Sequence, residues 1–232
     1  YQTVGWEQDK DGLFADTKAF VDTRAVSVDF GGKCISRLNK YFSKGGRYLL
    51  DAGSGPIPQD ELLSYGERFE QRVCVDFSVS ALRTARSKIG DRGAYLQADL
   101  TNLPLKDGSM DAVTCNHVIY QIPAENQAAA FLELWRVLKP GGIGVIVYWW
   151  RDAPLAWRIE RLARLFVGNR AEQASETLPA SATLPELYHH PHSLSWFKSQ
   201  NWPFRYRIES FRVINNAFLR NYVSNDWRGR AF

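Results

Sequence analysis

The first residues in this sequence that could bind a ligand or take part in a reaction follow an apolar run and include two closely spaced glycines. Residues 48–55 read Tyr-Leu-Leu-Asp-Ala-Gly-Ser-Gly, so the run ends at Asp51, and Gly53 and Gly55 flank Ser54. Glycine permits a tight turn and lets a ligand approach the main chain where a side chain would block it. The segment therefore predicts a buried strand that runs into a nucleotide-binding turn.

Two acidic residues further along the chain suit an adenosine. Asp76 ends the apolar run 72–76, where a carboxylate can accept hydrogen bonds from both hydroxyls of a ribose. The ring of Phe77 can lie against the face of an adenine. Asp99, followed by Leu100, comes after the third predicted strand and can accept a hydrogen bond from the exocyclic amine of adenine. In this order, these residues indicate a site for an adenosine-containing ligand.

The elements that must position these residues alternate between strands and helices. We expect strands over 47–51, 72–76, 94–97, 111–116 and 143–150, and helices over 59–70, 79–89 and 124–138. Such alternation predicts parallel strands joined by right-handed crossovers. The flanking elements are expected to be helices within 11–44, a helix over 154–167, a long connection over 168–192, a helix over 193–200 and strands over 205–213 and 217–223.

With these elements in place, residues 47–150 resemble the class I S-adenosylmethionine-dependent methyltransferases. The resemblance includes the Leu-Pro-Leu-Lys-Asp-Gly-Ser-Met-Asp-Ala-Val stretch at 103–113 and Leu-Lys-Pro-Gly-Gly at 138–142, and it points to the small-molecule, ubiquinone/menaquinone-biosynthesis-like branch. It implies an α/β, Rossmann-like fold with a seven-stranded, mostly parallel sheet and helices on both faces. Residues 1–232 would form one domain, with an N-terminal helical cap (1–44), a cofactor-binding core (45–150), a helical insertion or lid after strand five (151–192) and a C-terminal helix with the last strands (193–232).

The same resemblance implies which residues bind the cofactor, S-adenosyl-L-methionine, and its product, S-adenosyl-L-homocysteine. The predicted set is Asp51, Gly53, Ser54, Gly55, Asp76, Phe77, Asp99, Leu100, Asn116 and His117. One departure is the sequence Pro56-Ile57-Pro58, where family members often have a third glycine, so the resemblance does not define where the next helix starts. Pro58 also stands where the fingerprint of a nicotinamide dinucleotide enzyme, the alternative for this half, requires glycine.

Two residues after the fourth predicted strand are candidates for catalysis. His117 would lie beside the reactive methyl group, and an imidazole with a reference pKa of about 6.5 suits a general base. Tyr120 is the weaker candidate. The alternative is that His117 only packs against the cofactor.

The second half of the chain supplies the candidates for acceptor binding. Trp149 is the penultimate residue of the fifth predicted strand, and His189, His190 and His192 fall within four residues. We expect these four to bind an aromatic or lipophilic acceptor, methylated on oxygen or nitrogen, and we expect no metal site. A surface or hinge role for the three histidines is the alternative.

Composition narrows the class of protein without naming the acceptor. The net charge is +4, the Arg residues are enriched towards the end of the chain, and no cysteine pair has metal-ligand or disulfide spacing. We expect a cytoplasmic protein without a signal peptide or membrane span, acting on a small molecule rather than on nucleic acid. The sequence does not define the oligomeric state, for which a homodimer is one option. An RNA methyltransferase and a non-catalytic cofactor-binding subunit that activates a partner remain the alternatives.

Overall fold

A computed structural model describes residues 24–152, 188–212, 214 and 216–226. The predicted helix over 154–167, and the parts of the predicted N-terminal helices and long connection that fall within 1–23 and 153–187, lie outside these described residues. None of the helices in the described part of the chain combines the length and the apolar character that crossing a membrane requires.

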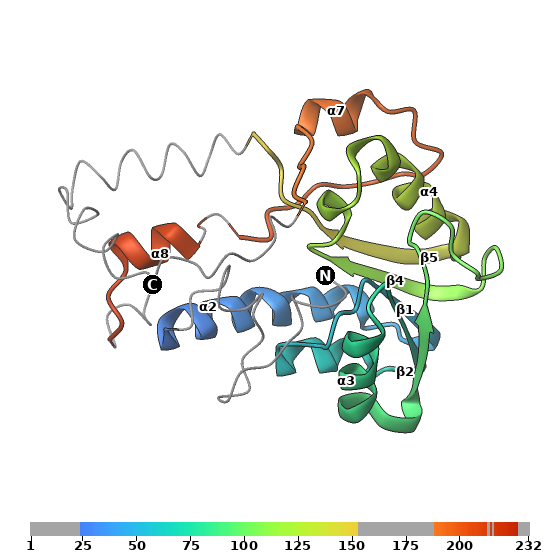
Figure 1. Ribbon diagram of the computed structural model, residues 1–232, viewed down its shortest axis with the longest axis horizontal. Coiled ribbons are helices and arrows are strands. Elements are labelled where there is room, and N and C mark those ends of the chain that lie inside the picture. The colour runs from blue at the N-terminus through green and yellow to red at the C-terminus, as the bar shows by residue number, and fades with distance from the viewer. Residues whose placement is uncertain (1–23, 153–187, 213, 215, 227–232) are drawn as a thin grey trace.

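A parallel five-stranded sheet forms the centre of the described structure (Figure 1). Its strands are β1 (Gly46–Ala52), β2 (Phe69–Asp76), β3 (Gly93–Gln97), β4 (Met110–Asn116) and β5 (Leu138–Val147). The order across the sheet is β3-β2-β1-β4-β5, so β1 lies in the middle: the chain adds β2 and β3 on one side of it and then crosses over to add β4 and β5 on the other. This places the carboxyl ends of β1, β2 and β4 side by side.

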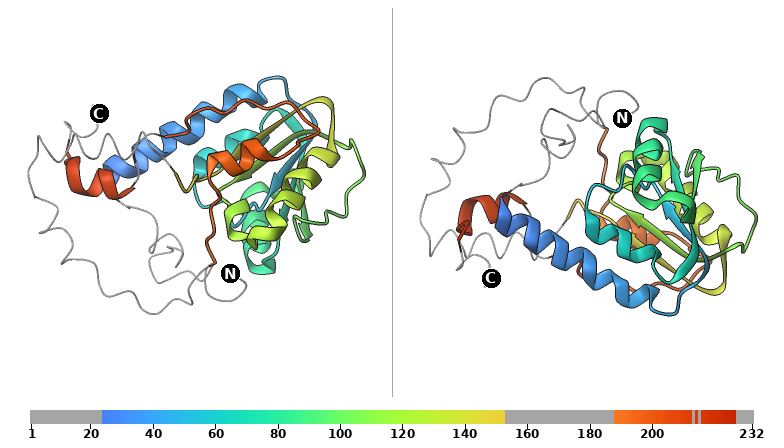
Figure 2. Two further views of the ribbon diagram at one scale, coloured as in Figure 1. Left: turned by 90° about the horizontal axis from the view of Figure 1, so that it is seen from above. Right: turned by 90° about the horizontal axis from the view of Figure 1, so that it is seen from below.

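Helices cover the two faces of this sheet (Figure 2). The α-helices are α2 (Ala25–Ser36), α3 (Val79–Ile89), α4 (Gln127–Val137), α7 (Leu194–Ser199) and α8 (Asn216–Tyr222). Short 3₁₀ helices are η1 (Arg37–Phe42), η2 (Asp60–Gly66), η3 (Gly90–Arg92), η4 (Ile119–Gln121) and η5 (Ala124–Asn126). The predicted α/β class with helices on both faces is confirmed.

The core divides because successive side chains of a strand point to opposite faces of the sheet. Leu50 joins the cluster that includes Phe131 of α4 and Phe197 of α7. Its neighbour Leu49 joins the opposite cluster, which includes Phe42 of η1. Both leucines of β1 are fully buried, which explains why this strand reads as an uninterrupted apolar run.

Three sequence predictions of secondary structure are wrong. The sheet has five strands among the described residues instead of seven, because residues 205–212 form no strand and 216–222 form helix α8. Residues 205–210 are all exposed, so their alternating pattern buries neither face. Leu219 of α8 and Val223, the residue after its end, lie four residues apart and pack against Val26 of α2, which favours a helix. The helix expected over 59–70 is reduced to η2, and β2 already begins at Phe69.

Candidate functional site

The turn after β1 lies at the carboxyl edge of the sheet and depends on glycine. Gly53 has a φ of 69° and Gly55 a φ of 55°, both in the left-handed region that glycine adopts readily. A Cβ atom at Gly53 would lie 2.5 to 3.0 Å from side-chain atoms of Val118. The amides of Gly53 and Ser54 donate to the carbonyl of Val75, at 2.7 and 3.1 Å. The turn is therefore fixed to the end of β2.

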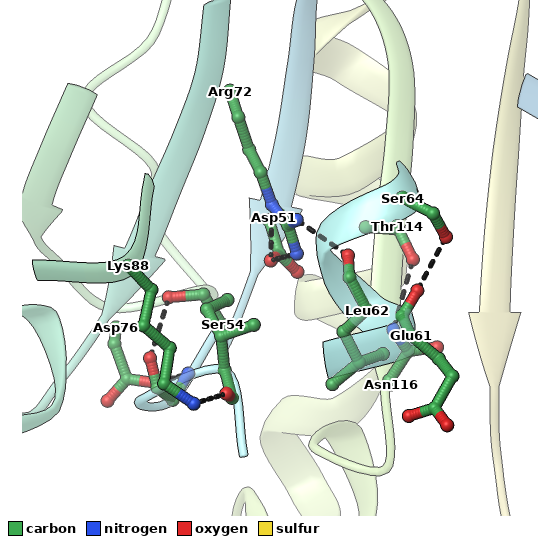
Figure 3. A network of polar contacts seen from close by, with 12 residues as sticks. Asp51, Ser54, Glu61, Leu62, Ser64, Arg72, Asp76, Lys88, Thr114 and Asn116 are labelled. Carbon is green, nitrogen blue, oxygen red and sulfur yellow. Dashed lines mark hydrogen bonds and ion pairs between the residues drawn. The ribbon is translucent and has the colours of Figure 1, made fainter. Parts of the chain in front are cut away.

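The segment after the turn explains the departure at Pro56-Ile57-Pro58. Instead of starting a helix there, the chain continues as a loop in which Ile57 is buried with a φ of 53°, a conformation that is unusual for a β-branched residue. Lys88 of α3 donates to the carbonyl of Ile57 at 2.6 Å, and the Gly55 amide donates to Oδ2 of Asp76 at 2.8 Å (Figure 3). We call residues 52–61 the cofactor loop, because they include Gly53, Ser54 and Gly55, which the sequence predicts to bind the cofactor.

Asp76 ends β2 beside the cofactor loop. Its Oδ1 accepts from the amide of Ser78 at 2.8 Å and its Oδ2 from Gly55, so each oxygen binds one backbone N–H. Each carboxylate oxygen can accept a second hydrogen bond, as two neighbouring hydroxyls would require. Burial raises the pKa of Asp76, and the two backbone donors partly oppose that increase. The geometry suits a residue that holds a diol.

The other predicted adenosine contacts surround Asp76. Phe77 leaves 57% of its surface exposed, which is unusual for an apolar ring and leaves it open to stacking. Asp99 is exposed, and its Oδ1 accepts from the amide and the hydroxyl of Thr101, both at 2.8 Å. Leu100 is buried next to it. The amide of Ala98 donates to the Asp76 carbonyl, so this segment lies directly beside the end of β2.

Asp51 has a partner that the sequence analysis did not assign. Its carboxylate is buried and accepts hydrogen bonds from Arg72 of β2. The structure therefore places Asp51 beneath the cofactor loop, in an ion pair. Its predicted direct contact with a cofactor stays a prediction.

Asn116, at the end of β4, has a buried acceptor atom. Its amide nitrogen donates to the Thr114 hydroxyl at 3.2 Å, but its Oδ1 accepts no hydrogen bond from the described residues. A buried carbonyl oxygen without a donor is unfavourable and indicates that a donor can be bound there. The atom lies at the same edge of the sheet as the cofactor loop.

His117 follows Asn116 in a left-handed conformation. Its φ is 60°, and its amide donates to the carbonyl of Val147 at the end of β5, at 2.9 Å. Its ring lies 5.7 Å from that of Phe211 and 6.1 Å from that of Tyr120, measured between centroids. Burial, and the positive charge of Arg212, lower the pKa of His117 to about 4. The imidazole is therefore neutral near pH 7 and a weak base.

Tyr120 is the centre of a cluster that we call the aromatic wall, formed by Tyr120, Trp149 and His189. The three ring centroids lie 4.9 to 6.5 Å apart. Tyr120 is buried, whereas Trp149 leaves 53% of its surface exposed. The structure thus brings together both catalytic candidates and two of the four residues predicted to bind the acceptor.

The other two predicted acceptor residues face elsewhere. The ring of His190 lies near those of Tyr188 and His192. His192 stacks on Trp196 with centroids 3.6 Å apart, and its Nε2 lies 3.1 Å from the carbonyl of Ala124. The ring of His190 therefore packs within the segment 188–192, whereas the ring of His192 holds this segment against η5 and α7. Within the described part of the chain, no three His, Cys, Asp or Glu residues are grouped as a metal site would require.

Comparisons with known proteins show what the sequence around this site is similar to. Residues 50–146 match the protein-family model described as "Methyltransferase domain". The chain is 30% identical over 158 residues to the ubiquinone/menaquinone biosynthesis C-methyltransferase UbiE of Shewanella pealeana, and the alignment covers 61% of each protein. Residues 50–146 therefore carry a methyltransferase domain, and this part of the chain is similar to the class I S-adenosylmethionine-dependent methyltransferase family.

Two further comparisons cover different shares of the chain. The malonyl-[acyl-carrier protein] O-methyltransferase of Legionella pneumophila is 31% identical over 121 residues, which cover 50% of this chain and 41% of that protein. Among solved structures, the YcgJ protein from Bacillus subtilis has a TM-score of 0.49 at 21% identity, covering 72% of this chain and 64% of that one. The chain spans less than two thirds of the length of the curated relatives named here.

S-adenosylmethionine is the methyl donor of this methyltransferase family, and the residues present suit it. Asp76 can hold two hydroxyls, the exposed ring of Phe77 can stack on a base, and Asn116 offers an unpaired, buried oxygen to a donor such as an ammonium group. Both glycines of the turn leave the main chain open to a ligand.

Three residues at this site were missed by the sequence analysis. Arg72 and Lys88 hold the cofactor loop, and Phe211 lies against His117. Only Arg72 gave a signal, because a charged residue within an apolar strand requires a buried partner. Lys88 resembles any exposed helical lysine, and Phe211 comes from a segment whose path the sequence does not predict.

Proposed function

We propose that this chain transfers a methyl group from S-adenosylmethionine to a small aromatic or lipophilic molecule, on an oxygen or a nitrogen atom. The observation that carries this proposal is the position of the aromatic wall beside His117, at the same edge of the sheet as Gly53, Asp76 and Asn116. A donor held by the last three would direct its methyl group towards the wall.

Each part of the donor has a corresponding residue. Asp76 would accept from the ribose hydroxyls, Phe77 would cover the adenine and Asp99 would accept from its amine. Asn116 Oδ1 would accept from the ammonium of the methionine part. When bound, the donor supplies a sulfonium that activates the methyl carbon for displacement.

The protein would contribute mainly positioning and the exclusion of water. The flat rings of Tyr120 and Trp149 can orient a planar acceptor in line with the methyl group. The entropy lost in aligning the two reactants is a large part of the barrier to such a displacement, and a site that holds them aligned lowers it. His117, with a pKa of about 4, would be neutral and could accept a hydrogen bond from the acceptor, but it would remove a proton poorly. This favours amines and readily ionised hydroxyls as acceptors.

Calorimetric titration with S-adenosylhomocysteine tests the donor site. We expect Asp76→Ala to weaken binding at least about tenfold, because two charge-assisted hydrogen bonds to the ribose are lost. Asp91→Ala, which removes an exposed carboxylate from η3, serves as the control and should bind normally. Equal affinity of Asp76→Ala and the wild type would contradict the donor site.

Methyl transfer itself is tested with methyl-labelled donor and a panel of phenols, catechols, aromatic amines and quinols. Label should appear in at least one aromatic acceptor and should decline strongly in Trp149→Ala. Transfer only to RNA, or tight donor binding with turnover only after a partner protein is added, would contradict the proposed acceptor class.

A further inference from the structure

Arg72 is a charged residue in the apolar strand β2, and its side chain is only 3% exposed. Its guanidinium uses three nitrogens. Nε and Nη2 donate to Oδ2 of Asp51 at 3.0 and 2.5 Å, and Nη1 donates to the carbonyl of Leu62 at 2.7 Å (Figure 3). One side chain is thus bonded to two separate segments.

These two segments are the two ends of the cofactor loop. Asp51 is the residue before the loop begins, and Leu62, in η2, is the residue after it ends. Between them, Asp76 holds Gly55 and Lys88 holds Ile57. Of the side chains of Asp76, Lys88 and Arg72, only that of Arg72 binds both ends of the loop. It therefore fixes the distance between these two ends.

Stability alone does not explain an arginine at this position. A buried ion pair recovers in attraction roughly what it loses in desolvation, and apolar residues often replace such a pair without loss of stability. What arginine provides in addition is geometry, because its planar group directs several donors in fixed directions. A lysine can satisfy one end of the loop, and a methionine neither.

We propose that Arg72 is a positioning residue for the cofactor, holding the loop at 52–61 in its binding shape before the cofactor arrives. The proposal rests on the proposed function, because it assumes that this loop binds S-adenosylmethionine. A loop already ordered in the free protein loses less conformational entropy on binding, so the gain is in affinity.

The test is calorimetric titration of S-adenosylhomocysteine into wild type, Arg72→Met and Arg72→Lys, at a temperature where circular dichroism shows each variant to be folded. We expect Arg72→Met to raise Kd about tenfold or more, and Arg72→Lys to recover part of that loss. Val73→Ala is the matched control: it destabilises the same strand through the core on the opposite face and should leave Kd unchanged.

Each outcome bears on a different claim. If the wild type binds and folded Arg72→Met binds equally tightly, the positioning role is overturned. Tighter binding by Arg72→Met would also overturn it, because Asp51 would then be a cofactor ligand that Arg72 competes for. If Arg72→Met does not fold, Arg72→Lys decides, since unchanged affinity there contradicts the two-ended contact. Failure of the wild type to bind contradicts the proposed function instead.

Discussion

At the scale of single residues, His117 shows how the backbone sets the chemistry of a side chain. Its left-handed conformation, stabilised by the hydrogen bond to Val147, turns the chain so that the imidazole meets Phe211 and Tyr120. Burial there and the charge of Arg212 lower its pKa. The sequence is compatible with two roles for His117, and the low basicity of its imidazole favours packing and orientation over proton removal.

The depressed pKa of His117 predicts a pH dependence of stability. Its folded-state pKa of about 4 lies below the reference value of about 6.5. Between these values the unfolded chain binds more protons, so the free energy of unfolding should fall as the pH falls through this window. Urea unfolding of His117→Gln should show a smaller decrease than the wild type between about pH 7 and pH 5.

Above about pH 7 neither state takes up this proton, so the difference between His117→Gln and the wild type should no longer change with pH. This range is the internal control. Parallel stability curves across the whole acid range would show that the histidine titrates normally in the folded protein.

At the scale of elements, the cofactor loop and its neighbours act as a unit. The turn is bonded to Val75, the loop to Asp76 and Lys88, and the space above Gly53 is filled by Val118, which follows His117. The cofactor loop and the segment that bears the catalytic candidates are therefore in direct contact. A substitution in one of these two segments should therefore alter the conformation of the other.

Gly53→Ala separates two reasons for glycine at the turn. The new methyl group meets Val118 and the φ of 69° disfavours any side chain, so we expect a loss of about 1–3 kcal/mol in the free energy of unfolding. Adding Val118→Ala removes the contact but not the backbone strain. The double variant should therefore recover part of the loss that chemical denaturation measures for Gly53→Ala; no recovery would mean that backbone strain alone accounts for it.

The sequence predicts best the strands that the core covers on both faces, because their apolar runs can be recognised locally. Strands around Leu50, Val73 and Val113 follow from apolar runs, because both faces of the sheet are covered. The segment 216–222 was mispredicted because its helix depends on Val26, far away along the chain. Similarly, the glycines and Asp76 of the site follow from local sequence, whereas the contact of His189 with Tyr120 depends on how residues 188–192 return to the sheet.

At the scale of the whole molecule, the two ends of the described chain meet. Helix α8 packs beside α2 (Figure 1), where Leu219, Val223 and Ile214 bury Val26. Arg24 donates to the carbonyl of Val223 at 3.0 Å, and the Val26 amide donates to Asn225 Oδ1 at 3.3 Å. This small cluster shares no buried residue with the two clusters of the sheet.

Because this cluster shares no buried residue with those of the sheet, we expect it to unfold locally while the sheet stays folded. Leu219→Ala removes a fully buried side chain from it, and we expect faster amide hydrogen exchange in the first turns of α2 and in α8, with exchange in β1 and β4 unchanged. The affinity for S-adenosylhomocysteine should also be unaffected. Equal acceleration in the central strands would show that the two ends and the sheet unfold as one cooperative unit.

The position of β5 has a consequence for how the protein behaves in concentrated solution. Among the described residues β5 pairs with β4 on one side and with no strand on the other, and its Ile143 is 37% exposed. The stretch Ile143-Gly144-Val145-Ile146-Val147 carries no charge, so wherever that side is open to solvent it can template a strand of another molecule. The strand that leads into Trp149, and so into the aromatic wall, is then also where self-association would begin, and a lysine in place of Ile143 is the substitution that would suppress it.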